Sequence, residues 1–80
     1  MARMPVNPPV QVTSAAGWRA RIMDLDCHDT DLLHGDIETP GMGHIQRAWN
    51  DVGICRNATP DCNIDARDPS VAALISRCKP

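Results

Sequence analysis

The segment Val10–Met23 has the sequence VQVTSAAGWRARIM, and it carries the strongest structural signal in the chain. Apolar and polar residues alternate over Val10–Ser14 and again over Trp18–Ile22, as they do in half-buried strands. The segment between them ends in Gly17, and glycine adopts positive φ in tight turns without steric cost. The sequence therefore predicts a β-hairpin. Its core face would carry Val10, Val12, Trp18, Ala20 and Ile22.

A helix is expected downstream, near residues 40–52. Thr39 suits the N-cap position, and Pro40 suits the first helical position. Apolar residues then recur three and four positions apart, and Gly53 is placed to end the helix. This helix would add to the core Ile45, Ala48, Trp49 and Val52.

A second short helix is expected near residues 69–78, because Asp68-Pro69 repeats the start signal and an apolar face follows. Its core residues would be Val71, Leu74 and Ile75. The predicted fold class is α+β, a single small domain over residues 10–80 in which the hairpin packs on the two short helices. A third short strand at Asp36–Glu38 is an option. The proline-rich residues 1–9 would be extended or disordered.

Acidic residues are concentrated in the middle of the chain. Residues 22–46 contain six acidic side chains and no lysine or arginine, although the whole chain has a net charge of only −2. One interpretation is a solvated, loop-rich face. The other is a surface that binds a basic partner, since complementary charge speeds and orients an encounter. The residues concerned are Asp24, Asp26, Asp29, Asp31, Asp36 and Glu38.

The leading functional hypothesis is therefore a small regulator or inhibitor that binds a larger basic protein. Carboxylates spaced like phosphates could occupy a groove made for nucleic acid, so the protein would mimic nucleic acid rather than bind it. Direct nucleic-acid binding is not expected, because there is no basic stripe and no Phe or Tyr on which bases could stack. The excess of Asp over Glu and of Arg over Lys also fits a GC-rich bacterial or phage genome.

No catalytic or cofactor motif stands out. Cys27 lies among aspartates, which oppose formation of a reactive thiolate. Gly41 and Gly43 resemble the start of a phosphate-binding turn. However, the third glycine of a dinucleotide-binding fingerprint is missing after them, and so is the Gly-Lys-Ser/Thr of a P-loop. We therefore expect a protein that is not an enzyme and that has no cofactor.

The four cysteines leave several states open. Free, partly buried thiols are the first interpretation. Disulfides are the second, and four cysteines allow three pairings. Among them, Cys55–Cys62 would close a tight loop, and Cys27–Cys78 would tie the middle of the chain to the last helix. A module held together by these cysteines, through disulfides or zinc, is the alternative to the acidic interaction protein.

A metal site is not expected. Structural zinc sites use paired ligands two to four residues apart, whereas six residues separate Cys55 from Cys62. The stretch Asp24–Asp29 resembles the start of a calcium loop. However, its sixth position lacks the glycine, and its twelfth position lacks the glutamate, that such loops require.

The sequence also predicts where the protein works. The longest apolar run, Val71–Ile75, is far shorter than a membrane span. The first residues carry one positive charge but no apolar segment typical of a secretory signal. We therefore expect a cytoplasmic protein without membrane contact, as a monomer or a homodimer.

Overall fold

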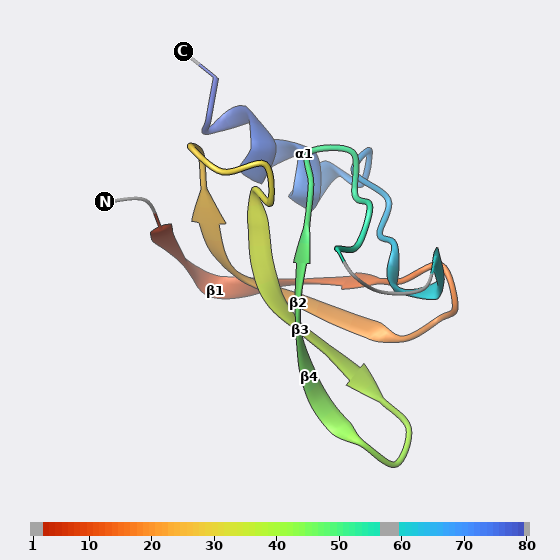
Figure 1. Cartoon of the computed structure of the whole chain (residues 1–80). Helices are drawn as coiled ribbons and strands as arrows, with labels where there is room; N and C mark the ends of the chain where they lie inside the picture. The colour runs from red at the N-terminus through yellow and green to blue at the C-terminus, as the bar shows by residue number, and fades with distance from the viewer. Residues whose placement is uncertain (1–2, 57–59, 80) are drawn as a thin grey trace.

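The computed structural model describes residues 3–56 and 60–79 of the chain. Four strands form one antiparallel sheet in which sequence neighbours are also spatial neighbours, in the order β1-β2-β3-β4 (Figure 1). One 3-10 turn and one α-helix follow the sheet. The bounds are β1 Arg3–Thr13, β2 Arg19–Asp26, β3 Leu33–Thr39, β4 Gly43–Trp49, η1 Pro60–Cys62 and α1 Pro69–Ser76.

The predicted hairpin is present as β1 and β2, with Val12 paired with Ala20. Both strands are longer than expected, because β1 extends back to Arg3 and β2 forward to Asp26. Residues 3–9 are therefore extended and belong to the sheet, while residues 1–2 lie outside the described part of the chain. Strand β1 is an edge strand, which is where prolines disturb a sheet least.

The predicted helix near residues 40–52 is wrong. Residues Gly43–Trp49 form β4, which pairs with β3 along its whole length. The chain turns into β4 with Gly41 and Gly43 at φ of 78° and 70°, a conformation that ends strands and does not begin helices. Ile45 and Trp49 are four residues apart, so they share a face in a strand as they would in a helix.

The predicted fold class is corrected accordingly. The chain is mostly an antiparallel four-stranded sheet with one short helix, and not an α+β hairpin packed on two helices. Trp49 is fully buried, but it comes from a strand, whereas Val52 is 60% exposed. Much of the core lies in the acidic segment between residues 24 and 38, which was expected to be loop-rich. The buried core residues of this segment are Leu25, Leu32, Leu33 and Ile37.

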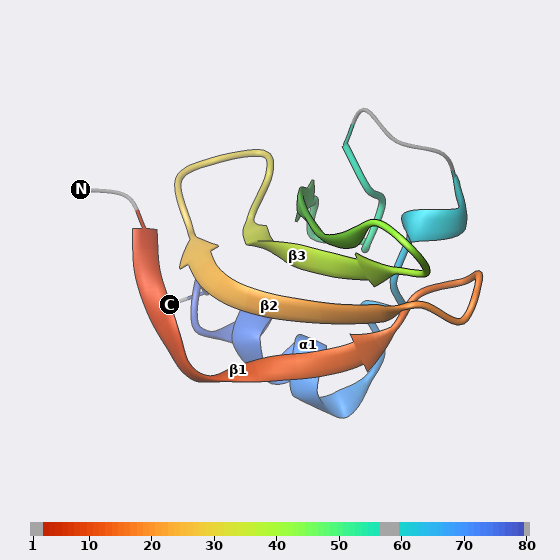
Figure 2. The same ribbon diagram turned by 90° about the horizontal axis from the view of Figure 1, so that it is seen from below.

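Helix α1 lies close to its predicted position. Asp68 caps it, since its carboxylate accepts a hydrogen bond from the backbone N–H of Ser70 at 2.9 Å. The helix packs on the face of the sheet formed by β1 and β2 (Figure 2), where it buries Val71 and Leu74. Among the described residues, no helix is long and apolar enough to cross a membrane.

All four cysteines form disulfides, so the first interpretation, free thiols, is wrong. Cys27, which follows β2, is bonded to Cys78, which follows α1, with the two Cα atoms 5.0 Å apart. Cys55 is bonded to Cys62 with a Cα–Cα distance of 5.7 Å. The first bond holds α1 to the sheet, and the second joins the segment after β4 to η1.

Candidate functional site

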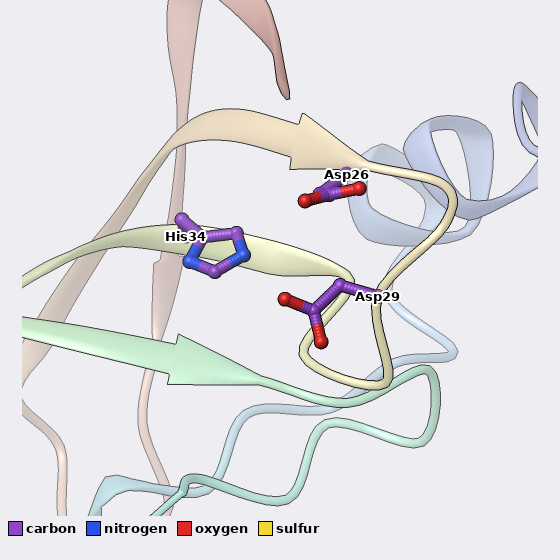
Figure 3. A group of neighbouring side chains, drawn as sticks. All are labelled: Asp26, Asp29 and His34. Carbon is purple, nitrogen blue, oxygen red and sulfur yellow. The ribbon is translucent and has the colours of Figure 1, made fainter. Parts of the chain in front are cut away.

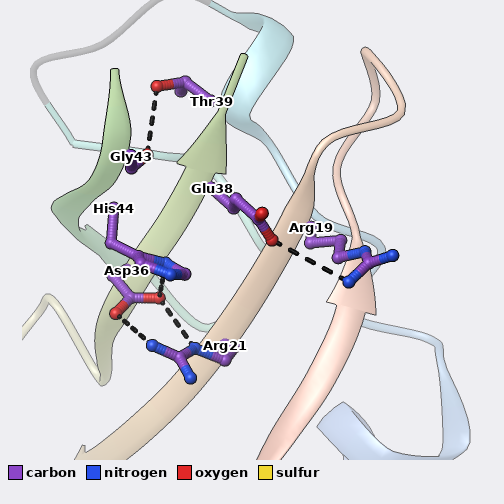
Figure 4. Close-up of polar contacts among 7 residues, drawn as sticks. All are labelled: Arg19, Arg21, Asp36, Glu38, Thr39, Gly43 and His44. Carbon is purple, nitrogen blue, oxygen red and sulfur yellow. Dashed lines mark hydrogen bonds and ion pairs between the residues drawn. The ribbon is translucent and has the colours of Figure 1, made fainter. Parts of the chain in front are cut away.

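The structure separates the six acidic residues that were predicted to bind a partner. Asp36 and Glu38 lie on β3, facing arginines of β2 (Figure 4). The other four lie at the opposite end of β2 and in the loop that leads to β3. They are Asp24, Asp26, Asp29 and Asp31.

Asp36 is the best-paired acid of the sheet. Arg21 donates two hydrogen bonds to it, and His44 Nδ1 lies 3.5 Å from its Oδ1. The hydrogen bonds from Arg21 are the main reason that the pKa of Asp36 lies below its ordinary value, although burial acts the other way. Glu38 has a weaker partner, with its Oε2 3.9 Å from Arg19 Nη1. Each acid on this face thus has a cation beside it.

Asp31 is also neutralised within the chain. Its side chain is buried and forms a charge-assisted hydrogen bond with Arg56 Nη1. Asp24 is half-buried at the end of β2. Of the six acids, only Asp29 and Glu38 are exposed, so the structure does not form one continuous acidic face from all of them.

A second arrangement lies at the end of β2, where Asp26 and Asp29 approach His34 of β3 (Figure 3). One potential ligand atom from each residue lies within 4.8 Å of the other two. Asp26 is only 5% exposed and Asp29 is exposed. We call these three residues the Asp-Asp-His cluster.

Backbone hydrogen bonds orient both carboxylates of the cluster. Asp26 Oδ1 accepts from the N–H of His28 at 3.1 Å, and Asp29 Oδ1 accepts from the N–H of Asp31 at 3.2 Å. The hydrogen bond from Asp31 is the main cause that lowers the pKa of Asp29. The loop between β2 and β3 therefore orients both aspartates, the buried Asp26 more tightly than the exposed Asp29.

His34 completes the cluster from the neighbouring strand. Its Nε2 is buried and has no hydrogen-bond partner among the described residues. The ring lies to one side of the two carboxylates, with one nitrogen directed toward them (Figure 3). The pairing of Leu25 with Leu33 brings the start of β3 beside the end of β2 and so determines this position.

The next residue, Gly35, allows β3 to approach β2 closely. A Cβ atom at this position would collide with the backbone carbonyl of Arg21 and crowd the Cα of Ile22. Beside it, a polar groove of about 530 Å³ opens on the sheet, and His34 contributes to its lining together with Arg3, Asp24 and Arg47. Asp26 and Asp29 do not line this groove, so it borders the cluster only at His34.

The Asp-Asp-His cluster was not predicted from the sequence. Its aspartates were considered only as part of a calcium loop, no metal site was expected, and His34 had no predicted role. Two carboxylates and one imidazole are ligand types that can hold a divalent cation. No local motif connects these residues, because His34 is eight residues from Asp26 and five from Asp29. Only the pairing of β2 with β3 brings the three side chains together.

Comparisons with known proteins do not assign this chain to a group. No protein-family model matches it, and neither does any curated protein or solved structure. Its function has to be inferred from the chemistry of its own residues.

Proposed function

We propose that the protein is a small, disulfide-stapled domain that works by binding a partner and not by catalysis. The observation that carries this proposal is the pair of disulfides around a small core. A chain of this length buries a limited share of its surface, and natural domains of this size often use disulfides to compensate. The four cysteines would then serve to hold a binding surface in a fixed shape.

The positions of the disulfides support this role. Cys27–Cys78 holds the start of the β2–β3 loop against the end of α1, and this loop carries Asp29 and Asp31. A surface that is already ordered before binding loses less conformational entropy when the partner arrives. The loop is therefore the part of the molecule best prepared for recognition.

The same bonds bear on the compartment in which the protein works. Disulfides persist in oxidising environments and are rare in the cytosol, where thiols are kept reduced. We therefore propose that the protein works in an oxidising compartment. The cytoplasmic location expected from the sequence is the competing proposal.

A basic protein remains the proposed partner, with a narrower contact surface. Asp31, Asp36 and Glu38 already have arginine partners, and a ligand would have to displace these. Asp24 and Asp29 form no ion pair within 4.0 Å among the described residues. Binding through these two aspartates leaves the internal ion pairs intact, so the contact is proposed to centre on them.

The stapled state is tested by the thiol content of the protein in its native source. Cells are lysed in the presence of an alkylating reagent, and the intact mass is measured. The proposal expects no alkylated cysteine unless a reductant is added first. Four alkylated cysteines in the untreated sample, together with an unfolding temperature that a reductant does not change, would refute it.

The contact surface is tested with an arginine-rich peptide as the probe, by isothermal titration at low and high salt. The double variant Asp24→Lys/Asp29→Lys should weaken binding at least about tenfold, because it replaces attraction by repulsion. Asp61→Lys/Asp65→Lys is the matched control, since it changes the net charge equally at two exposed positions that do not line a groove with Asp29. Equal losses in both variants, or binding that is insensitive to salt, would count against the proposed surface.

A further inference from the structure

We propose that the Asp-Asp-His cluster of Asp26, Asp29 and His34 is a binding site for a divalent transition-metal ion, with Zn²⁺ as the best-fitting probe. This site does not depend on a basic partner, so it can be tested separately from the function proposed above.

The spacing of the ligand atoms fits a single ion. Zinc binds imidazole nitrogen and carboxylate oxygen at about 2.0–2.2 Å, so ligand atoms around a tetrahedral ion lie about 3.4 Å apart. The three candidate atoms all lie within 4.8 Å of one another. A small closing movement would bring them to that distance. The exposed Asp29 can make this movement, while the buried Asp26 and the strand residue His34 stay in place.

An independent observation also points to a ligand. His34 Nε2 is buried, yet it has no hydrogen-bond partner among the described residues. Buried polar atoms normally have a partner, because losing water without replacement costs free energy. The side of the ring that faces Asp26 and Asp29 is where a cation would bind all three side chains (Figure 3). The bound ion would give the nitrogen the partner that it lacks.

The ligand types select the class of metal. Carboxylates alone suit Ca²⁺ and Mg²⁺, whereas an imidazole ligand favours zinc, copper, iron and nickel. Three protein ligands are one fewer than a closed structural zinc site has, so one position remains for water or for a donor atom of a bound molecule. Backbone hydrogen bonds from His28 and Asp31 orient the two carboxylates, as outer contacts do in metal sites.

The first test is metal binding by the tag-free, disulfide-bonded protein. Zn²⁺ is titrated in competition with a chromophoric chelator, and Co²⁺ is added separately to read its visible absorption bands. We expect one ion per chain, with Zn²⁺ bound at least about a hundredfold more tightly than Ca²⁺ or Mg²⁺. Absence of Zn²⁺ binding, or equal affinity for Zn²⁺ and Ca²⁺, would overturn the proposal.

The second test assigns the ligands. His34→Ala and Asp29→Asn should each lower Zn²⁺ affinity about tenfold or more. His28→Ala and His44→Ala are the controls, because both residues are exposed and lie outside the cluster, and they should change the affinity less than twofold. Wild-type affinity in His34→Ala would refute the site. Disulfide content and circular dichroism show whether each variant is folded.

A third measurement does not rely on any variant. In nuclear magnetic resonance spectra of the wild-type protein, Zn²⁺ should shift the Nε2 signal of His34 and leave the ring signals of His28 and His44 in place. Shifts of the exposed histidines alone would overturn the proposal. His34→Ala retains Asp24 and Asp29, so loss of metal binding without loss of peptide binding separates this site from the function proposed above.

Discussion

Arg21 of β2 and Asp36 of β3 are directly opposite in the sheet, and their side chains meet through two parallel hydrogen bonds. Arg21 Nε donates to Oδ1 at 3.2 Å, and Nη2 donates to Oδ2 at 3.0 Å. The carboxylate is largely buried, with 13% of its side chain exposed. This bidentate geometry is the strongest form of an arginine–carboxylate contact, and it stabilises the ionised acid.

The Arg21–Asp36 pair should make the stability of the protein depend on pH. The pKa of Asp36 in the folded protein lies below that of an unfolded aspartate, about 3.9, mainly because Arg21 donates to it. Its contribution is therefore fully present above that unfolded value and is lost as the pH falls through the folded pKa. Urea unfolding at a series of acidic pH values, with a chelator present, should show this loss.

The variant Asp36→Asn tests whether the Arg21–Asp36 pair causes this pH dependence of stability. It should lower the free energy of unfolding near pH 7 by about 1 kcal/mol and flatten the decline at acidic pH. Asp51→Asn is the control, since Asp51 is exposed and has no ion pair among the described residues. An unchanged acid profile in Asp36→Asn would show that other groups determine it.

The two disulfides should contribute unequally. Cys27–Cys78 spans 51 positions of sequence and Cys55–Cys62 spans 7, and a longer loop restricts the unfolded chain more. Removing the first pair with Cys27→Ser/Cys78→Ser should cost about 4 kcal/mol, and removing the second with Cys55→Ser/Cys62→Ser about 2 kcal/mol. Urea unfolding of both double variants checks the order. A greater loss from the short loop would contradict this account.

Trp49 should stabilise the core through a polar contact as well as by its size. It is fully buried, and its indole Nε1 donates to the carbonyl oxygen of Cys62 at 2.9 Å. Trp49→Phe keeps an aromatic ring but leaves that buried oxygen unpaired, so it should cost about 1–3 kcal/mol. Trp18→Phe, at a half-buried position, should cost less, and its remaining Trp49 should fluoresce at the short wavelengths of a buried indole. Equal losses in the two variants would argue against the hydrogen bond.

Gly35 should not tolerate a side chain. A Cβ there would meet the backbone of Arg21 and Ile22, which cannot move without separating β2 from β3. Gly35→Ala should therefore lower the free energy of unfolding by about 2 kcal/mol or more. Gly41→Ala is the control, because its Cβ would meet no atom within 4 Å and only its positive φ is strained. A similar, small loss in both would show that the sheet adjusts more easily than expected.

Local patterns in the sequence determined two parts of this protein. The alternation in Val10–Met23 specified the β1–β2 hairpin, and Asp68-Pro69 specified the start of α1. Both signals act between residues close in sequence, through the period of a strand and the capping of a helix. They could be recognised without knowing what the rest of the chain does.

The tertiary structure alone decided the remainder. The spacing of Ile45 and Trp49 suits a helix and a strand equally, and pairing with β3 selected the strand. Cys27 and Cys78 are 51 positions apart in sequence, and the packing of α1 on the sheet places them side by side. His34 joins Asp26 and Asp29 because the register of β2 and β3 places it there. Each of these depends on contacts between distant segments, which a local pattern does not encode.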